Sequence, residues 1–211
     1  ASQNLLLGEG DDMLLGGGGN DVLQGGRSAV GQWEFTLAND GALGARHETA
    51  VVARGAWEAL ALGDLDRAQA DLAFLSAGSG TLTETALLYH AAFGRAADIG
   101  GLNYYLSHGV GASTLARAFV ASTEWAASGM NALTDGAFVQ QLYRQVLDRD
   151  GEAAGLAYWN GQLAGGVTTR ADVLLAFALG DEHRATHVDG LVVAAGTVDT
   201  ENGWIGASGD D

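Results

Sequence analysis

The sequence predicts an α+β protein that is mainly α-helical, with a double three-helix unit, a short parallel β-roll and a few strands at its N-terminal side. Three observations lead to this prediction. A nine-residue glycine- and aspartate-rich period opens the chain, a stretch of alternating apolar and polar residues follows, and a helical pattern occurs twice in the second half. We therefore divide the chain into a repeat segment at 1–27, strands and a connecting helix at 28–80, helical repeats at 81–187, and a C-terminal segment at 188–211.

Composition limits the function classes. The 211 residues are 47% hydrophobic, which is sufficient for a folded core. Acidic residues number 26 against 10 basic ones, and the net charge of -16 opposes binding to nucleic acid and to anionic lipid. The absence of cysteine excludes disulfides and thiolate metal sites, and no apolar run approaches the roughly 20 residues of a membrane-spanning helix. We expect neither nucleic-acid binding nor membrane insertion.

The first segment carries glycines and aspartates in a regular pattern. In GEGDDMLLGGGGNDVLQGG, at 8–26, Asp12 and Asp21 are equivalent at a spacing of 21 − 12 = 9 positions, and the glycines repeat with them. Glycine turns expose backbone carbonyls beside the carboxylates, and calcium prefers about 6 to 8 oxygen ligands. The pattern predicts a calcium-binding roll. The alternative interpretation is a flexible glycine-rich linker. The predicted ligand-bearing residues here are Gly8, Gly10, Asp12, Gly17, Gly19 and Asp21.

This period resembles the nonapeptide GGxGxDxUx of repeats-in-toxin (RTX) proteins, where U is a large apolar residue. Residues 16–24, GGGGNDVLQ, match it fully, and 7–15 lack only the first glycine. Residues 206–211, GASGDD, match its first six positions except at Ala207, which adds Asp211 to the predicted ligands. The resemblance implies calcium bound between turns two repeats apart, type I secretion, and a bacterial extracellular or cell-surface location. Because two repeats cannot close many sites, we interpret the chain as a segment of a longer protein.

The second segment predicts strands that give way to a helix. Residues 33–37, WEFTL, alternate so that Trp33, Phe35 and Leu37 face inward, and the turn signal Asn39-Asp40-Gly41 predicts that this strand enters a hairpin. Apolar residues at helical spacing follow between 65 and 75. We interpret this region as a continuation of the β-roll that leads into the helices.

The third segment contains an internal repeat. YHAAFGRAADIGGLNYY at 89–105 aligns with YRQVLDRDGEAAGLAYW at 143–159 at a constant offset, 143 − 89 = 54 positions. After a slightly longer loop, Phe119 aligns with Phe177 and Glu124 with Glu182, so a third helix also repeats. Ahead of the first copy, Thr81 with Glu84 predicts a capping box, and Leu88, Ala91 and Ala92 predict its buried face. Two related three-helix units should therefore pack together.

These copies resemble a helical domain of unknown function, with the signature YxxxLGRxxDxxGLxYW, that is found in tandem in bacterial RTX and surface-layer proteins. The resemblance covers residues 81 to about 187. It implies a fold and a secreted setting, and it names no ligand.

Several side chains in the copies are candidates for chemistry. Arg95 and Arg149 follow a helix, and we interpret them as structural, bonding helix carbonyls or the nearby Asp98 and Asp150. Tyr105 and Trp159 are candidate contacts for a cell-surface polysaccharide, and a place in the core is the alternative for both.

Two further patterns resemble metal sites, and for each we favour an interpretation without a metal. The loop DRDGE at 148–152 has some features of a calcium loop, but an ordinary interhelical loop is favoured. His183 and His187 share a helix face as zinc ligands do, but the sequence offers no third ligand in register. No nucleophile elbow, phosphate-binding loop or complete zincin motif occurs, so we expect no enzyme active site.

The sequence therefore predicts an extracellular, calcium-binding structural or adhesion module of a larger secreted RTX protein. It would contribute to surface assembly through self-association, or to glycan contact. The alternative is a non-catalytic, calcium-folded appendage of a secreted metalloprotease, lipase or lyase.

Overall fold

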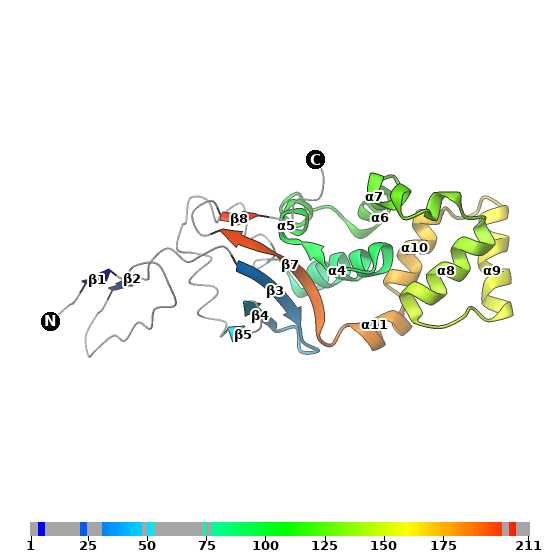
Figure 1. Cartoon of the computed structure of the whole chain (residues 1–211). Helices are drawn as coiled ribbons and strands as arrows, with labels where there is room; N and C mark the ends of the chain where they lie inside the picture. The colour runs from blue at the N-terminus through cyan, green and yellow to red at the C-terminus, as the bar shows by residue number, and fades with distance from the viewer. Residues whose placement is uncertain are drawn as a thin grey trace.

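The structure is a computed structural model of the chain, and it is α+β and mostly helical, as predicted (Figure 1). It describes residues 4–6, 22–24, 31–47, 50–52, 74, 77–199 and 203–205. None of the helices in these ranges has the length and apolar character needed to cross a membrane.

The main sheet of the described part mixes antiparallel and parallel pairs. Its strand order is β5-β4-β3-β7-β6, and β8 also pairs with β7. The strands are β3 (Gly31–Leu37), β4 (Leu43–His47), β5 (Ala50–Val52), β6 (Ala97–Asp98), β7 (Leu191–Asp199) and β8 (Gly203–Ile205).

Strand β3 confirms the predicted alternation. Trp33, Phe35 and Leu37 are buried. The chain turns back into β4 around Gly41, whose positive φ of 80° suits glycine. Strand β4 is antiparallel to both of its neighbours, β3 and β5. Neighbouring strands of a β-roll are parallel, so the predicted continuation of the roll is wrong for these three strands.

Strand β7 was not predicted. It pairs antiparallel with β3 from Gly31↔Val198 to Leu37↔Leu191, and it pairs in parallel with β6. The segment after the helices therefore belongs to the same sheet as the segment before them. The end of the chain that carries the predicted ligand Asp211 lies outside the described residues.

A separate two-stranded pair lies near the N-terminus. Strand β1 (Asn4–Leu6) pairs in parallel with β2 (Val22–Gln24), and Leu5 is the partner of Leu23. Paired residues are thus 23 − 5 = 18 positions apart, which is twice the period of the glycine-rich repeat.

The two helical copies are confirmed, but each has four helices in place of the predicted three, because the predicted third helix is two separate helices in the structure. The first copy consists of α4 (Ser79–Phe93), α5 (Ile99–Ser107), α6 (Ala112–Val120) and α7 (Thr123–Ala127). After a 3-10 turn, η1 (Met130–Ala132), the second copy consists of α8 (Asp135–Leu147), α9 (Ala153–Ala164), α10 (Arg170–Ala178) and α11 (Asp181–His187).

The start of α4 differs from the prediction. Its N-cap is Gly78, which makes no side-chain capping bond, and Thr81 lies inside the helix. The predicted capping box of Thr81 with Glu84 is therefore wrong, because the helix begins one turn earlier. The predicted buried face of Leu88, Ala91 and Ala92 is confirmed.

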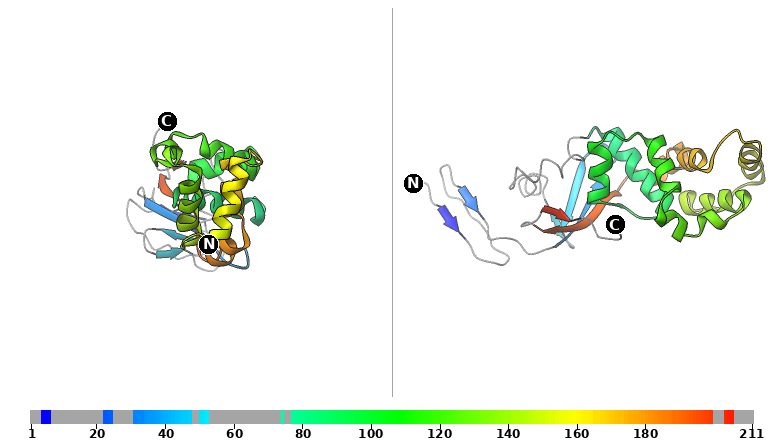
Figure 2. Two further views of the ribbon diagram at one scale, coloured as in Figure 1. Left: turned by 90° about the vertical axis from the view of Figure 1, so that its right-hand side faces the viewer. Right: turned by 90° about the horizontal axis from the view of Figure 1, so that it is seen from above.

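The first copy lies against the sheet and the second extends away from it. Helices α4 and α5 contact β7, whereas α8 and α9 form the far end of the molecule in the views of Figures 1 and 2. Equivalent helices therefore have different surroundings. Helix α5 buries Ile99, Leu102 and Asn103, and no residue of α9 is fully buried.

Candidate functional site

The repeated residues of each copy form one compact contact, which we call the arginine clamp. In the first copy, Arg95 donates from Nε and Nη2 to the two carboxylate oxygens of Glu124, both at 2.8 Å. The guanidinium carbon lies 5.4 Å from the ring centre of Tyr89, and this ring packs edge-on against Phe119. The clamp ties the loop after α4 to the short helix α7.

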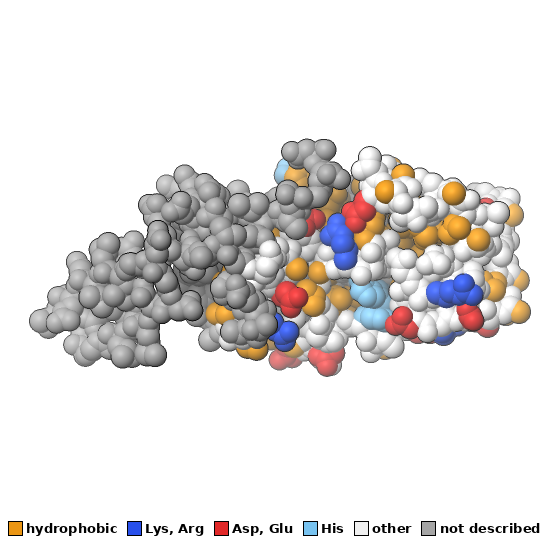
Figure 3. Space-filling model, in the orientation of Figure 1, with side chains coloured by type: hydrophobic (Ala, Val, Ile, Leu, Met, Phe, Trp, Pro, Cys, Tyr) orange, Lys and Arg blue, Asp and Glu red, His pale blue; other side chains and the backbone are white. Residues whose placement is uncertain are grey.

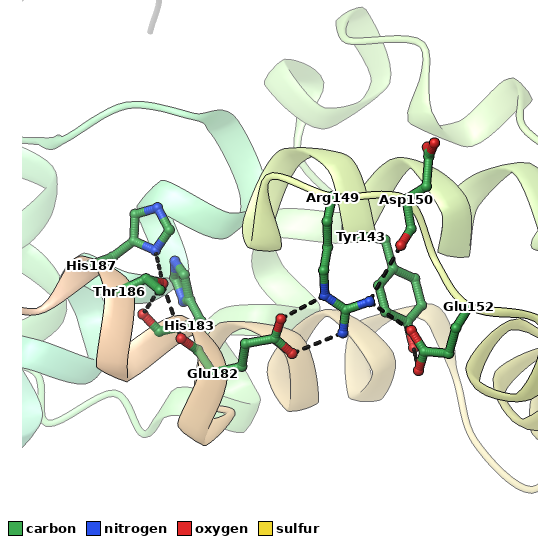
Figure 4. Close-up of polar contacts among 8 residues, drawn as sticks. All are labelled: Tyr143, Arg149, Asp150, Glu152, Glu182, His183, Thr186 and His187. Carbon is green, nitrogen blue, oxygen red and sulfur yellow. Dashed lines mark hydrogen bonds and ion pairs between the residues drawn. The ribbon is translucent and has the colours of Figure 1, made fainter.

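The second copy builds the same clamp (Figure 4). Arg149 donates to the two carboxylate oxygens of Glu182 at 2.6 and 2.9 Å, and to Glu152 at 2.6 Å. Its guanidinium carbon lies 4.9 Å from the ring centre of Tyr143, which packs edge-on against Phe177. Each aligned Tyr, Arg, Phe and Glu thus has the same role in both copies.

A glycine completes each clamp. A Cβ at Gly101 would lie 2.6 Å from the hydroxyl of Tyr89 and 2.9 Å from the carboxylate of Asp98. A Cβ at the equivalent Gly155 would collide with the hydroxyl of Tyr143 and lie 2.6 Å from Glu152. The tyrosine hydroxyl occupies this space, which only glycine leaves open.

Of the two predicted arginine–aspartate pairs, the structure has the first and lacks the second. Arg95 lies 3.8 Å from the carboxylate of Asp98. Arg149 contacts Asp150 only through its backbone carbonyl, while the Asp150 carboxylate pairs with Arg144 at 2.8 Å.

In the second copy, the clamp arginine lowers the pKa of its carboxyl partners. Hydrogen bonds from Arg149 hold the pKa of Glu182 and of Glu152 below its usual value. Burial, aided by Asp98, raises the pKa of Tyr89. The clamp therefore consists of a neutral phenol and charged partners that already bind one another, which is typical of a structural contact.

The candidate glycan contacts are half-buried. Tyr105 packs near the ring of Phe119 at 6.0 Å, and Trp159 packs near Phe177 at 5.8 Å. Among the large apolar side chains that the structure describes, the exposed aromatic ones are their neighbours Tyr104 and Tyr158, each 57% exposed and equivalent in the two copies.

The predicted calcium residues Gly8, Gly10, Asp12, Gly17, Gly19, Asp21 and Asp211 lie outside the described residues. The DRDGE loop is described. Its Asp150 pairs with Arg144 and its Glu152 with Arg149, while Asp148 ends helix α8 in the left-handed conformation, with φ of 52°. Both pairs are consistent with the favoured interpretation of an ordinary interhelical loop.

The third ligand that the sequence lacked is His90. It lies on α4 of the first copy and meets His183 and His187, which lie on α11 of the second. One ring nitrogen of each lies within 4.8 Å of the others, so the group could hold a metal. Nδ1 of His90 is 3.0 Å from Nε2 of His183, and Nδ1 of His183 is 2.7 Å from the carbonyl of Ala178. We call His90, His183 and His187 the histidine cluster.

The cluster lies partly inside the molecule. His183 is fully buried, and His90 and His187 are half-buried. In Figure 4, Glu182 extends toward Arg149, while His183 and His187 lie together away from the clamp. Histidine side chains reach the surface on the face drawn in Figure 3, beside an acidic side chain.

Burial keeps His183 and His90 neutral. It lowers the pKa of His183 to about 4, and the neighbouring histidines act in the same direction. Burial also lowers the pKa of His90, assisted by His187 and opposed by Asp148. Neutral imidazole is the form that binds metal ions.

Local sequence could not find His90, because it precedes His183 by 183 − 90 = 93 positions. The internal repeat does contain a signal. At the equivalent positions the other copy has Arg144 for His90, Trp125 for His183 and Gly129 for His187. Three histidines that depart from the repeat and meet in space could have been found by comparing the copies.

Comparison with known proteins gives one match. A family model described as "Domain of unknown function (DUF4214)" matches residues 116–187, from within α6 to the end of α11. The matched part therefore contains the whole second copy, and the family it is similar to has no assigned activity. No curated protein and no solved structure matches the chain.

Proposed function

We propose that this chain is a non-catalytic structural module of a secreted RTX-type protein, ordered by calcium at its glycine-rich repeats. The observation that carries the proposal is the register of β1 and β2. A roll built from two nonapeptides per turn places parallel neighbours two periods apart, and Leu5↔Leu23 has this separation (23 − 5 = 18).

The chemistry of the repeats supports calcium as the ordering ion. In the proposed roll, the carboxylates of Asp11, Asp12 and Asp21 would come close together and repel one another unless a cation lay between them. The glycine-rich turns lose much backbone entropy when they become ordered. Calcium binding offsets both costs, so the roll folds where calcium is abundant, as it is outside the cell.

The clamps support a structural role for the helices. Both clamp arginines use two donors on one carboxylate, and the clamp tyrosines are buried. The repeated residues are thus engaged within each copy and hold its loops together. We propose that the two copies serve as a rigid spacer.

The exposed tyrosines support contact with a partner. Tyr104 and Tyr158 occupy equivalent positions and are both 57% exposed, so the copies present the same aromatic side chain twice. Exposed tyrosine combines an apolar ring with a hydroxyl, which suits both protein surfaces and sugar rings. We propose self-assembly or contact with cell-surface polysaccharide through these residues.

Calcium titration tests the first part of the proposal. Isothermal titration of calcium into chelator-treated protein, with circular dichroism followed in parallel, should give saturable binding and a gain of β signal. Asp12→Asn and Asp21→Asn should lose both. Asp150→Asn is the matched control from the DRDGE loop and should bind as the original chain does. Binding that survives in the double variant Asp12→Asn/Asp21→Asn would overturn the assignment.

A separate experiment tests the partner surface. Sedimentation and polysaccharide pull-down in calcium should show association that is reduced in Tyr104→Ala/Tyr158→Ala. Val167→Ala removes part of another exposed apolar side chain and serves as the control. Equal association in the two variants would exclude the tyrosines as the contact.

A further inference from the structure

We propose that His90, His183 and His187 form a binding site for a zinc-class divalent transition ion, which joins the first helix of one copy to the last helix of the other. This site is separate from the calcium repeats in position and in chemistry. Imidazole nitrogen suits zinc, cobalt, nickel and copper, whereas calcium prefers oxygen ligands.

The hydrogen bonds around α11 prepare two of the three rings for a metal. Nδ1 of His183 donates to the carbonyl of Ala178, which leaves a lone pair on its Nε2. The hydroxyl of Thr186 donates to a backbone carbonyl of the same helix and lies 2.7 Å from Nδ1 of His187. In the tautomer in which His187 donates from Nδ1 to this hydroxyl, its lone pair is on Nε2. An outward N–H bond of this kind is a common feature of metal-binding histidines.

The third ring changes tautomer when the ion binds. Nδ1 of His90 lies 3.0 Å from the Nε2 lone pair of His183, so Nδ1 carries the proton in the metal-free protein. Metal binding through Nδ1 moves that proton to Nε2 of His90 and replaces the hydrogen bond between the rings. Two nitrogens on one tetrahedral zinc, each at about 2.1 Å, lie about 3.4 Å apart, so these two nitrogens need to separate by a few tenths of an ångström and both rings need to turn toward the ion.

Asp148 supplies a negative charge beside the cluster. Its Oδ2 lies 3.5 Å from Nε2 of His187, which is close to the spacing of two ligands on one ion. Asp148 is the one non-glycine residue with positive φ in the described part, and the equivalent position of the first copy is Gly94. The second copy thus has a carboxylate beside the cluster where the first copy has a glycine.

The ion would link distant parts of the chain. His90 and His183 are far apart in sequence, and α11 is followed almost directly by β7, the strand that pairs with β3. A metal at the cluster therefore fixes the helix that leads into the centre of the sheet. Because the site exists only when both copies are folded, metal binding stabilises the folded state.

Metal titration of the full chain tests the proposal. Protein treated with chelator, then held in saturating calcium, is titrated with Zn²⁺ and separately with Co²⁺. One Zn²⁺ per chain should bind with a dissociation constant below about 10 μM. Zinc at about 100 times this constant should raise the midpoint of thermal unfolding by about 5 °C or more. Co²⁺ should give the visible absorption of a four-coordinate site.

The variants locate the ion. His90→Gln and His187→Gln, both half-buried positions, should weaken zinc affinity by at least about tenfold, with circular dichroism confirming that they fold. Asp148→Gly keeps the backbone of the equivalent Gly94 and removes only the carboxylate, so it should weaken affinity several-fold. His108→Gln changes an exposed histidine at the end of α5 and should bind zinc as the original chain does. Unchanged affinity in the double variant His90→Gln/His187→Gln, or no saturable zinc binding up to about 1 mM, would overturn the proposal.

Discussion

The two helical copies have the same clamp but different contacts with each other. At one junction, Trp125 of α7 packs near Phe138 of α8, with ring centres 6.2 Å apart. At the other junction, His183 of α11 bonds His90 of α4. Trp125 and His183 are equivalent in the repeat, and both are fully buried. One junction is apolar and the other is polar.

A second pair of equivalent positions also has an apolar residue at the first junction and a polar residue at the second. Phe138 of the apolar junction corresponds to Glu84 of the polar one, at the same offset that relates Tyr143 to Tyr89. Glu84 faces Arg184 of α11 at 3.6 Å. The repeated residues within each copy thus preserve its internal structure, while the residues that face the other copy are free to differ. A new site can arise at such a junction without disturbing the clamps.

The largest expected change in stability comes from placing the histidine of one junction at the equivalent position of the other. Trp125→His places an imidazole in an apolar site where Phe138 offers no hydrogen bond. Trp125 already buries an indole Nε1 without a hydrogen-bond partner among the described residues, and the imidazole adds a second ring nitrogen to a smaller apolar surface, which should lower the free energy of unfolding by about 3 to 5 kcal/mol. Urea denaturation measures this loss. Trp125→Phe keeps an apolar ring and should lose clearly less; equal losses in the two variants would show that ring size alone matters.

A smaller effect should distinguish clamp glycines from other helix glycines. Gly155→Ala in α9 forces Tyr143 and Glu152 apart and should lower the free energy of unfolding by about 1 to 3 kcal/mol. Gly101→Ala should act in the same direction in the first copy. In the same helix α9, Gly161→Ala meets no atom within 4 Å and should be neutral or stabilising by up to about 1 kcal/mol. A loss in Gly161→Ala equal to that in Gly155→Ala would contradict the clamp.

The ends of α4 and α8 provide a third comparison. Gly94 and Asp148 are equivalent and both have positive φ, at 66° and 52°. Gly94→Ala should destabilise the metal-free protein by about 1 kcal/mol, because alanine is strained in this conformation. Asp148→Gly should stabilise it by up to about 1 kcal/mol. Thermal unfolding in chelator measures both, and shifts of the same sign would contradict the expectation.

The smallest expected effect is the change with pH in the stability that the second clamp contributes. Arg149 lowers the folded-state pKa of Glu182 and Glu152, so the carboxylates contribute stability that is present above their unfolded pKa of about 4.3. This contribution is lost as the pH falls through the lowered folded-state pKa. The difference in urea midpoint between the original chain and Arg149→Gln should therefore shrink as the pH falls from about 6 to about 3. A difference that grows over this range would contradict the assignment.

The parts of the fold that depend on local pattern were predictable. The alternation at Trp33, Phe35 and Leu37 predicted β3, and the constant offset between the copies predicted that Tyr89 and Tyr143 would have the same role. Both rest on spacing that is visible within a short window.

The parts that depend on distant partners were not predictable. Strand β7 contains the apolar run Leu191-Val192-Val193, which suits a strand or a helix, and its pairing with β3 decides between them. The five-residue helix α7 is too short to show a helical period. His90 has no local relation to α11, so the histidine cluster emerges only when the copies pack together.

The pairing of β3 with β7 sets an order of folding. Leu37 and Leu191 are partners from opposite ends of the chain, and the helices α4 to α11 all lie between them. Contacts so distant in sequence form slowly, whereas helices form from local contacts. We expect the two copies to fold before the sheet closes, and a chain that stops within α11 to leave β3 paired with β4 alone. The sheet can thus be completed only in a chain that already contains the helices α4 to α11.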